Sequence, residues 1–213
     1  MNPLAPKQAM QLYGGLLSGH VHRVQLFLSL LELPFEFIKV NLAGGENRTP
    51  EFLAMSPFGE VPVLRDGDVV LTDSTAILVY LAAKYDASGR WMPREPLAAA
   101  TLQRWLSNAS GKIAYGPCTA RLVKVFGMPL DHQRAIVISD KLFAAMELEM
   151  STKQFALGTD ISIADIAAFS YIEQAPEGDI SLAPYPHIRA WLARIRSLPG
   201  FVAMPASPPK VAS

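Results

Sequence analysis

The stretch 60–74 places the strongest constraint on the fold, because it joins a strand hairpin to the start of a helix. Pro62 cannot donate a ladder hydrogen bond, so it belongs at the first positions of a strand. The peptide bond before such a proline can be cis. We expect a cis bond here, which turns the backbone of Val61 outward. Asp66-Gly67 separates two short apolar runs and is a strong hairpin signal. The sequence therefore predicts two antiparallel strands.

The hydrophobic period changes from that of a strand to that of a helix directly after this hairpin. Apolar side chains recur at helical spacing from Ala76 to Leu81. Thr72, Asp73 and Ser74 are all residues that cap helix N-termini well. The sequence therefore predicts a helix whose first turn opens at these three residues.

The chain before the hairpin alternates between strand and helix patterns. We predict a strand over 10–13, a helix over about 20–31 and a strand over 35–40. Together with the later hairpin and helix, the order is βαβ followed by ββα. This order predicts an α/β domain with a thioredoxin-like layout, in which a small mixed sheet lies between helices.

The second half of the chain has a different character. A polar segment rich in glycine and proline covers 87–96 and is the expected linker. We therefore expect a thioredoxin-like domain over 10–86 and an all-α domain over 97–204, with a flexible tail over 205–213. Long helical stretches cover 97–125 and 131–153.

One helix start in the second half is specified in detail. Ser162 is placed to cap a helix, and Asp165 is placed three residues later to reach back to the backbone of the capping residue. This is a capping box with aspartate in place of glutamate or glutamine. Pro186 favours the first turn of a last helix.

Composition excludes several classes of function. The chain has 213 residues, and its 19 basic and 19 acidic side chains cancel. This balance gives no electrostatic footprint for nucleic acid or an anionic membrane. A single cysteine, Cys118, excludes an internal disulfide framework and indicates a reducing cytoplasm. No apolar run approaches membrane-spanning length, so we expect an unexported protein without membrane contact. His20 and His22 lack further ligand groups at metal spacing, so no metal site is expected.

Several pieces of the chain, taken together, resemble the cytosolic glutathione S-transferase family, of the serine type found in theta, phi and bacterial members. The resemblance covers nearly the whole chain from Leu12 to Phe201, and the order and spacing of its pieces make it specific. The matching pieces are Leu12-Tyr13, Ser18-Gly19, Arg23-Val24, Thr49-Pro50-Glu51-Phe52, Ser56 to Leu64, Asp73 to Ile77, Tyr80-Leu81, Ser162 to Asp165, Tyr185-Pro186 and Trp191-Leu192.

The resemblance implies an enzyme that uses glutathione as a co-substrate, without a permanently bound cofactor. Glutathione would bind the thioredoxin-like domain, and a hydrophobic electrophile would bind between the two domains. The protein would be a cytoplasmic homodimer with a role in detoxification. The chemistry is thiolate activation. A free thiol with a pKa near 8.5 is only partly ionised at pH 7, and lowering the pKa by about two units stabilises the thiolate by roughly 2.7 kcal/mol.

Ser18 matches the position from which serine-type members donate a hydrogen bond to the glutathione sulfur. The hydroxyl is then a thiolate stabiliser and not the nucleophile. For an isolated Ser-Gly before a helix, the favoured interpretation is that the serine only caps the helix. Tyr13 offers a competing hydroxyl, because other branches of the family use a tyrosine at the end of the first strand. Without that role, Tyr13 is an aromatic residue packing on the sheet.

Asp73 and Ser74 match the family pair that holds the γ-glutamyl end of glutathione. Ser74 would receive the carboxylate at the helix N-terminus, and Asp73 would attract the ammonium group. The family pair is commonly Glu-Ser, so the side chain of Asp73 is shorter than usual. Val61, held by Pro62, would pair its backbone with the cysteinyl residue as a strand adds to a sheet edge.

Asn47 and Arg48 fall where family members place polar or basic side chains over the glycyl carboxylate. Arg48 can bind a carboxylate in a bidentate manner, or it can be a solvated surface residue. Glu60 replaces the usual glutamine or lysine and cannot donate to a carboxylate. Glu60 is counted among the glutathione-binding residues because of its position. Its side chain departs from the family pattern.

The electrophile site is expected to involve Leu17, His20 and Tyr115, of which Tyr115 lies on the first long helix of the second domain. Cys118 is expected to be a buried bystander. Two further functions stay open beside conjugation. One is a glutathione-dependent peroxidase, reductase or isomerase that uses the same thiolate. The other is an interaction module that keeps the fold without turnover.

Overall fold

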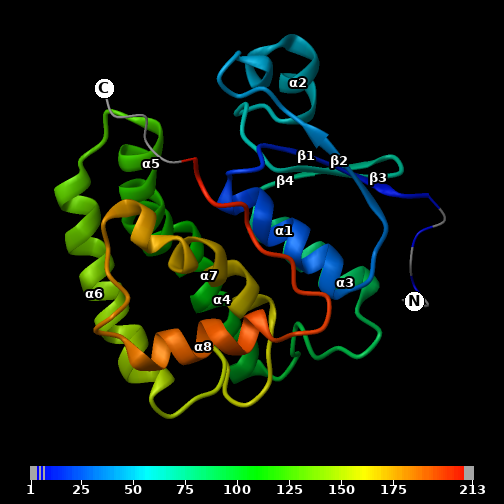
Figure 1. Ribbon diagram of the computed structural model, residues 1–213. Coiled ribbons are helices and arrows are strands. Elements are labelled where there is room, and N and C mark those ends of the chain that lie inside the picture. The colour runs from blue at the N-terminus through cyan, green and yellow to red at the C-terminus, as the bar shows by residue number, and fades with distance from the viewer. Residues whose placement is uncertain (1–3, 5, 7, 209–213) are drawn as a thin grey trace. The chain divides into compact units, whose positions relative to one another are not determined.

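A computed structural model describes residues 4, 6 and 8–208. The chain divides into two units, Met1–Met92 with Leu198–Pro205, and Pro93–Ser197 with Ala206–Ser213. The first unit, coloured blue to teal at its N-terminal part in Figure 1, carries the sheet. Its helices and strands are β1 (Met10–Gly14), α1 (Gly19–Leu30), β2 (Phe35–Lys39), η1 (Glu46–Arg48), α2 (Pro50–Met55), β3 (Val63–Asp66), β4 (Val69–Thr72) and α3 (Ser74–Tyr85).

The sheet has the strand order β2-β1-β3-β4. β1 pairs in parallel with β2, and the other two pairings are antiparallel. Asp66 pairs with Val69 across a turn in which Gly67 has a φ of 60°, a conformation that suits glycine. The predictions of a thioredoxin-like α/β domain and of the hairpin at Asp66-Gly67 are confirmed.

Helices cover both faces of this sheet (Figure 1). α1 and α3 contact each other on one face, toward which Met10, Leu12 and Gly14 of β1 are buried. A Cβ at Gly14 would lie 2.5 Å from a methyl carbon of Val21, so only glycine allows α1 to approach the strand this closely. α2 lies on the opposite face.

The core under α2 is a separate cluster. Val40, Phe52 and Val63 are buried there, and Tyr13 packs against them. The alternation along β1 therefore sends Tyr13 to the face opposite Leu12.

Segment 198–205 belongs to the first unit, whereas the sequence analysis placed 198–204 at the end of the helical domain and 205 in the tail. Two hydrogen bonds explain the difference. The Oγ of Ser29 donates to the carbonyl of Gly200 at 2.7 Å, and Nε2 of His22 lies 2.9 Å from the carbonyl of Val202. Both donors lie on α1, so the chain after the last helix runs along α1.

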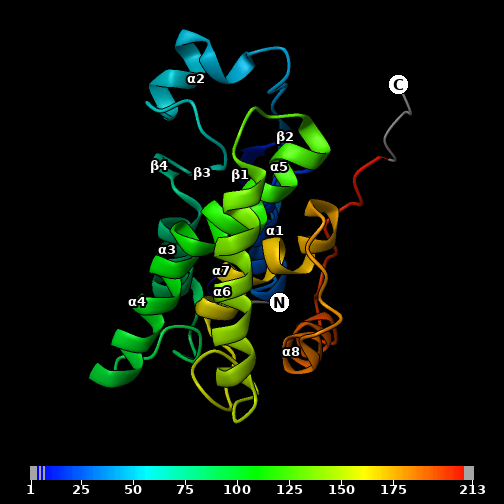
Figure 2. The ribbon, with the colours of Figure 1, turned by 90° about the vertical axis from the view of Figure 1, so that its left-hand side faces the viewer.

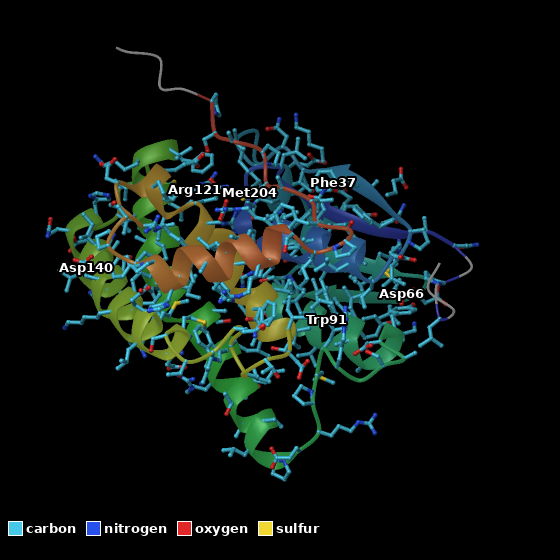
Figure 3. The ribbon with its side chains drawn as sticks, turned by 60° about the horizontal axis from the view of Figure 1, so that its bottom comes forward. Phe37, Asp66, Trp91, Arg121, Asp140 and Met204 are labelled. Atoms are coloured by element: carbon cyan, nitrogen blue, oxygen red, sulfur yellow. The ribbon has the colours of Figure 1, made fainter. Side chains whose placement is uncertain are left out.

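A polar cluster at the end of the hairpin is centred on Asp66 (labelled in Figure 3). Its Oδ2 accepts hydrogen bonds from the hydroxyls of Tyr80 and Tyr85 at 2.6 Å each and from Nζ of Lys84 at 2.8 Å. Burial raises the pKa of Asp66, but these three hydrogen bonds and the charge of Lys84 outweigh it and leave the pKa below its ordinary value. Burial and Asp66 together raise the pKa of Tyr85 to about 12. The carboxylate thus fastens the hairpin to α3.

We expect Asp66→Asn to lower the free energy of unfolding by about 1–3 kcal/mol at pH 7, because a buried charged acceptor is lost. A depressed pKa gives stability that is present above the unfolded pKa of about 3.9 and is lost as pH falls through the folded pKa. The difference in the free energy of unfolding between the variant and the wild type should therefore become smaller in acid. Urea unfolding at neutral and at acidic pH measures this difference. Asp68→Asn, at an exposed turn position, is the matched control, and an equal loss there would contradict the role of Asp66.

The second unit is helical, as predicted. Its elements are α4 (Pro96–Ser110), η2 (Ala114–Cys118), α5 (Thr119–Phe126), α6 (His132–Met150), α7 (Ile163–Glu173), η3 (Ala175–Gly178) and α8 (Pro186–Arg196). Figure 2 shows α4 and α6 as neighbours, and Arg104 of α4 forms an ion pair with Glu149 of α6 at 2.7 Å.

The predicted helix over 97–125 is interrupted by the π-helical segment η2. Pro117 lies inside it and has no backbone N–H to donate, which breaks the regular ladder. Gly116 lies so close to Ser139 of α6 that a Cβ would be 2.8 Å from the serine Oγ. The interruption therefore lies at a close approach of the chain to α6.

The capping box at Ser162 and Asp165 is present as predicted. Asp165 also reaches beyond its own helix. Its Oδ1 accepts from the backbone N–H of Ala156 at 2.7 Å and from Nε1 of Trp191 at 2.9 Å. The carboxylate therefore joins α7 to α8 and to the preceding loop.

The tail expected over 205–213 lies partly outside the described residues, which end at 208. Ser207 is described and is hydrogen-bonded within the second unit. Its Oγ donates to Glu177 at 2.6 Å, and its backbone N–H donates to the other oxygen of the same carboxylate at 2.9 Å. Arg121, which is buried, pairs with Glu177 at 2.6 Å.

Candidate functional site

Ser18 lies at the N-cap of α1, four residues after the end of β1. Its Oγ accepts a hydrogen bond from the backbone N–H of Val21 at 3.4 Å. In this bond the serine oxygen is the acceptor, so the hydroxyl hydrogen can still be donated. The cap and a donor role are therefore compatible at this residue. The positive end of the helix dipole lies at the same place.

The hydroxyl of Tyr13, the alternative donor, already has a hydrogen-bond partner. Its hydroxyl donates to Oε1 of Gln11 at 3.1 Å, and its ring packs in the cluster under α2. The phenolic proton is thus held by a neighbour on the same strand. This arrangement favours Ser18 as the free donor.

The peptide bond between Val61 and Pro62 is cis, as expected. β3 begins at Val63, so Val61 lies just outside the ladder. Within the described part of the chain, its N–H and C=O pair with no strand. An extended ligand can therefore use both groups of Val61 as an added strand would.

Asp73 caps α3 in an unusual backbone conformation, with φ of 65°. Its Oδ1 accepts from the backbone N–H groups of Thr75 and Ala76 at 2.8 and 2.9 Å and from the Thr75 hydroxyl at 2.6 Å. All three bonds end on one oxygen. Burial raises the pKa of Asp73, but these bonds and the charge of Arg23 outweigh it, so the carboxylate is ionised at neutral pH. The strained backbone is a feature often found at functional sites.

Ser74 follows at the first position of α3 and is 5% exposed. Asp73 accepts from the next two backbone N–H groups, so the N–H of Ser74 is a first-turn donor that the cap does not use. The Oγ of Ser74 accepts from Nη1 of Arg23 at 3.2 Å and lies 3.3 Å from Nδ1 of His20. The buried guanidinium of Arg23 therefore lies beside the first residue of α3.

Arg23 was given no role by the sequence, although it was part of a matching piece. It is fully buried on α1, and it reaches a serine 51 positions away. The signal that could have pointed to it is a charged residue among the apolar residues of α1, three residues after His20 and thus on the same helix face.

His20 was expected at the electrophile site, and the structure places it against Ser74. Burial lowers the pKa of His20 to about 3, and the charge of Arg23 adds to the shift while Asp73 opposes it. The imidazole is therefore neutral at physiological pH. It gives Ser74 a polar neighbour without adding a second positive charge.

Asn47 and Arg48 contact the loop before β3. Nδ2 of Asn47 donates to the carbonyl of Gly59 at 2.6 Å, and Nη1 of Arg48 donates to the carbonyl of Phe58 at 3.2 Å. Both side chains therefore support the segment that leads to Val61. Arg48 keeps further guanidinium donors for a carboxylate.

Glu60 is exposed, and its backbone is held by Ser56. The Ser56 hydroxyl donates to the carbonyl of Glu60 at 2.9 Å and accepts from its N–H at 3.1 Å. These two bonds fix the main chain just before Val61. The carboxylate of Glu60 faces solvent, where water screens it.

Two further candidates of the electrophile site lie in different units. Leu17 is half-buried in the loop before α1. Tyr115 lies in η2 of the second unit and is 67% exposed. Cys118, in the same π-helical segment, is buried.

Across the residues that the structure describes, no group of three or more histidine, cysteine, aspartate and glutamate side chains could hold a metal ion. None of the described helices is both long enough and apolar enough to cross a membrane.

Comparisons with known proteins agree with this geometry. Residues 17–84 match the family model "Glutathione S-transferase, N-terminal domain", and residues 133–199 match "Glutathione S-transferase, C-terminal domain". Glutathione S-transferase 3 of Zea mays is 32% identical, over 96% of this chain and 98% of the maize protein. Glutathione S-transferase GstB of Escherichia coli K12 is 30% identical, over 88% of this chain and 93% of that protein.

Solved structures show the same likeness. A glutathione S-transferase from Pseudomonas fluorescens superposes with a TM-score of 0.86 at 32% identity, covering 92% of this chain and 99% of the other. A glutathione transferase homologue from Drosophila mojavensis, solved with bound glutathione, has a TM-score of 0.81 at 29% identity, covering 90% of this chain and 89% of the other.

Proposed function

Because this chain belongs to the glutathione S-transferase family and is a glutathione transferase, we propose that Ser18 activates the thiol of glutathione for attack on hydrophobic electrophiles. In the reaction, the thiol proton is first released to water. The sulfur then forms a bond to the electrophilic carbon, and the leaving group departs with its electron pair. Ser18 donates a hydrogen bond to the sulfur while it carries negative charge.

The observation that carries this proposal is the position of Ser18 at the N-cap of α1 with its hydroxyl hydrogen still available. A charge-assisted hydrogen bond contributes about 1.5–3 kcal/mol. The helix dipole adds about 0.3–1 kcal/mol. Together they match the roughly 2.7 kcal/mol that corresponds to a shift of about two pKa units.

Glutathione is held, in this proposal, along the line from Val61 to Ser74. The backbone of Val61 pairs with the cysteinyl residue. The N–H of Ser74 and the charge of Arg23 receive the γ-glutamyl carboxylate, and Asp73 receives the ammonium group. Arg48 receives the glycyl carboxylate. The distances among Arg23, Ser74 and His20 support the γ-glutamyl part.

We expect Arg23→Met to raise KM for glutathione about ten- to a hundredfold, because the buried cation behind Ser74 is removed, while kcat changes little. Steady-state kinetics with varied glutathione measures the split between KM and kcat. Arg65→Met is the matched control, since Arg65 is an exposed arginine on β3 of the same unit. An unchanged KM in folded Arg23→Met would remove this residue from the glutathione site.

The experiment that tests the proposed function is a titration of the thiolate absorbance of bound glutathione from about pH 5 to pH 9. If the thiolate band appears at pH values well below the pKa of a free thiol, this supports an activated thiol. Absence of both the band and calorimetric binding at millimolar glutathione would favour the non-catalytic interaction module. Turnover of a hydroperoxide or disulfide without a stable conjugate would favour the peroxidase or reductase alternative.

A homodimer acting in the cytoplasm, with detoxification as its role, completes the proposal. Large apolar side chains at the surface support the dimer, among them Phe58 at 79%, Leu97 at 73% and Leu148 at 75% exposure. The single, buried cysteine suits a reducing compartment. Sedimentation equilibrium gives the oligomeric state.

A further inference from the structure

Two side chains of α1 converge on the hydroxyl of Ser74. Nη1 of Arg23 lies 3.2 Å from the Oγ of Ser74, and Nδ1 of His20 lies 3.3 Å from the same oxygen. His20 and Arg23 are three residues apart on α1, so they lie on one face of that helix. The helix contacts α3, which begins at Ser74 (Figure 1). One serine oxygen is therefore approached by two nitrogen atoms of a neighbouring helix.

The hydrogen-bonding capacity of Ser74 limits what these two nitrogen atoms can do. A serine hydroxyl has one hydrogen to donate and two lone pairs that accept. The guanidinium of Arg23 can only donate, so it takes one lone pair of the Ser74 oxygen. The bond to His20 then uses either the second lone pair or the hydroxyl hydrogen, and the state of the imidazole ring decides which.

The imidazole ring of His20 carries one hydrogen and no charge at physiological pH. Burial lowers the pKa of His20 to about 3, with a further contribution from the charge of Arg23 and an opposing one from Asp73. In a neutral ring, the hydrogen lies on either Nδ1 or Nε2. With the hydrogen on Nδ1, His20 donates to Ser74 and leaves the hydroxyl hydrogen for a third group. With the hydrogen on Nε2, Nδ1 accepts the hydroxyl hydrogen.

The place proposed above for the γ-glutamyl carboxylate favours one of these two tautomers. A carboxylate is attracted by a hydroxyl hydrogen and is repelled by the lone pairs of a hydroxyl oxygen. When Arg23 and His20 both donate to the Ser74 oxygen, its lone pairs are occupied and its hydrogen can point to the carboxylate. When His20 accepts instead, the carboxylate meets a lone pair.

We propose that His20 is a positioning residue for glutathione, whose Nδ1–H donates to the Oγ of Ser74 and so directs the Ser74 hydroxyl hydrogen at the γ-glutamyl carboxylate. This inference rests on the proposed function, because it concerns the orientation of a group in the glutathione site. In this role His20 acts through Ser74 and belongs to the glutathione site, whereas the sequence analysis placed it at the electrophile site.

Asparagine and glutamine form a matched pair of replacements for His20. The amide nitrogen of asparagine can take the place of Nδ1, whereas the longer side chain of glutamine puts its amide near the place of Nε2. We expect His20→Leu and His20→Gln to raise KM for glutathione about tenfold and to leave kcat within about twofold of the wild type. His20→Asn should keep both constants near those of the wild type. His187→Leu, at an exposed position of α8, is the control for loss of a histidine and should change neither.

An analogue of glutathione separates positioning from a general structural effect. In γ-aminobutyryl-cysteinylglycine, only the carboxylate that Ser74 would receive is missing. We expect calorimetry to show that His20→Leu weakens the binding of glutathione about tenfold and leaves the binding of this analogue unchanged. Heteronuclear NMR of the ring nitrogens in the wild type with bound glutathione should place the hydrogen of His20 on Nδ1.

Several outcomes would overturn the inference. Equal loss of affinity for glutathione and for the analogue in His20→Leu would make His20 a structural residue only. A ring hydrogen on Nε2 in the glutathione complex would show that His20 accepts from Ser74. An unchanged KM in folded His20→Leu, beside a wild type that binds and ionises glutathione, would refute the role of His20 and leave the proposed function intact. A wild type that neither binds nor ionises glutathione would overturn both.

Discussion

Replacing Ser18 by alanine is expected to lower kcat roughly ten- to a thousandfold and to leave KM for glutathione close to that of the wild type. The hydroxyl donates to the sulfur as charge develops, whereas the γ-glutamyl and glycyl ends of glutathione are held elsewhere. The pKa of the bound thiol should rise toward its free value in the same variant. Stopped-flow turnover and the thiolate absorbance titration measure the two effects on one preparation.

The cap role of Ser18 requires a control, because its Oγ also accepts from the N–H of Val21. Glycine is a good N-cap without a hydroxyl, and it costs only a few tenths of a kcal/mol in place of serine. Ser18→Gly should therefore unfold like the wild type and lose turnover like Ser18→Ala. If Ser18→Gly were fully active, the serine would only cap the helix.

Tyr13→Phe provides the second control. Its hydroxyl is held by Gln11, so its removal should leave kcat within about twofold of the wild type. A large loss in Tyr13→Phe together with normal turnover in Ser18→Ala would exchange the roles of the two residues.

Replacing Asp165 by alanine is expected to lower the free energy of unfolding by about 3–5 kcal/mol, because the carboxylate is buried and several donors lose their acceptor together. Oδ1 accepts from Ala156 and Trp191, while Oδ2 accepts from the N–H and Oγ of Ser162 at 3.0 and 3.2 Å. Burial raises the pKa of Asp165, and these four bonds oppose the shift. Urea unfolding followed by far-ultraviolet circular dichroism gives the loss.

Asp131→Ala is the matched control for this prediction. Asp131 caps α6 and accepts from the N–H of Arg134 at 2.9 Å, but it is exposed. Loss of such a cap costs about 1 kcal/mol. Equal losses in the two variants would show that Asp165 acts only as a helix cap. Turnover per folded molecule should be unchanged in both, because neither residue touches glutathione in the proposed site.

Local signals predicted the parts of the fold that short segments specify. The hairpin at Asp66-Gly67 follows from turn chemistry, and the capping box at Ser162 and Asp165 follows from spacing on one helix turn. Both involve residues at most a few positions apart. The backbone geometry of these segments is specified by interactions within each segment.

Contacts between distant segments could not be predicted in this way. Arg23 meets Ser74 across 51 positions, and Asp165 meets Trp191 across 26. No periodicity within one helix encodes such a partner. The π-helical segment also escaped prediction, because the close approach of Gly116 to Ser139 depends on how α6 packs. For the candidate site, the sequence named Ser18, Asp73 and Ser74, and the structure added the buried cation Arg23 beside Ser74.

The path of segment 198–205 along α1 means that the sheet-bearing unit is discontinuous in sequence. A gene fragment that ends at the linker would encode the whole sheet, yet it would leave His22 and Ser29 of α1 without the carbonyls of Val202 and Gly200. His22 is only 2% exposed, so its ring would also become exposed to solvent. Exchange of this unit between related enzymes therefore needs three crossover points, one near the linker, one after α8 and one after Pro205.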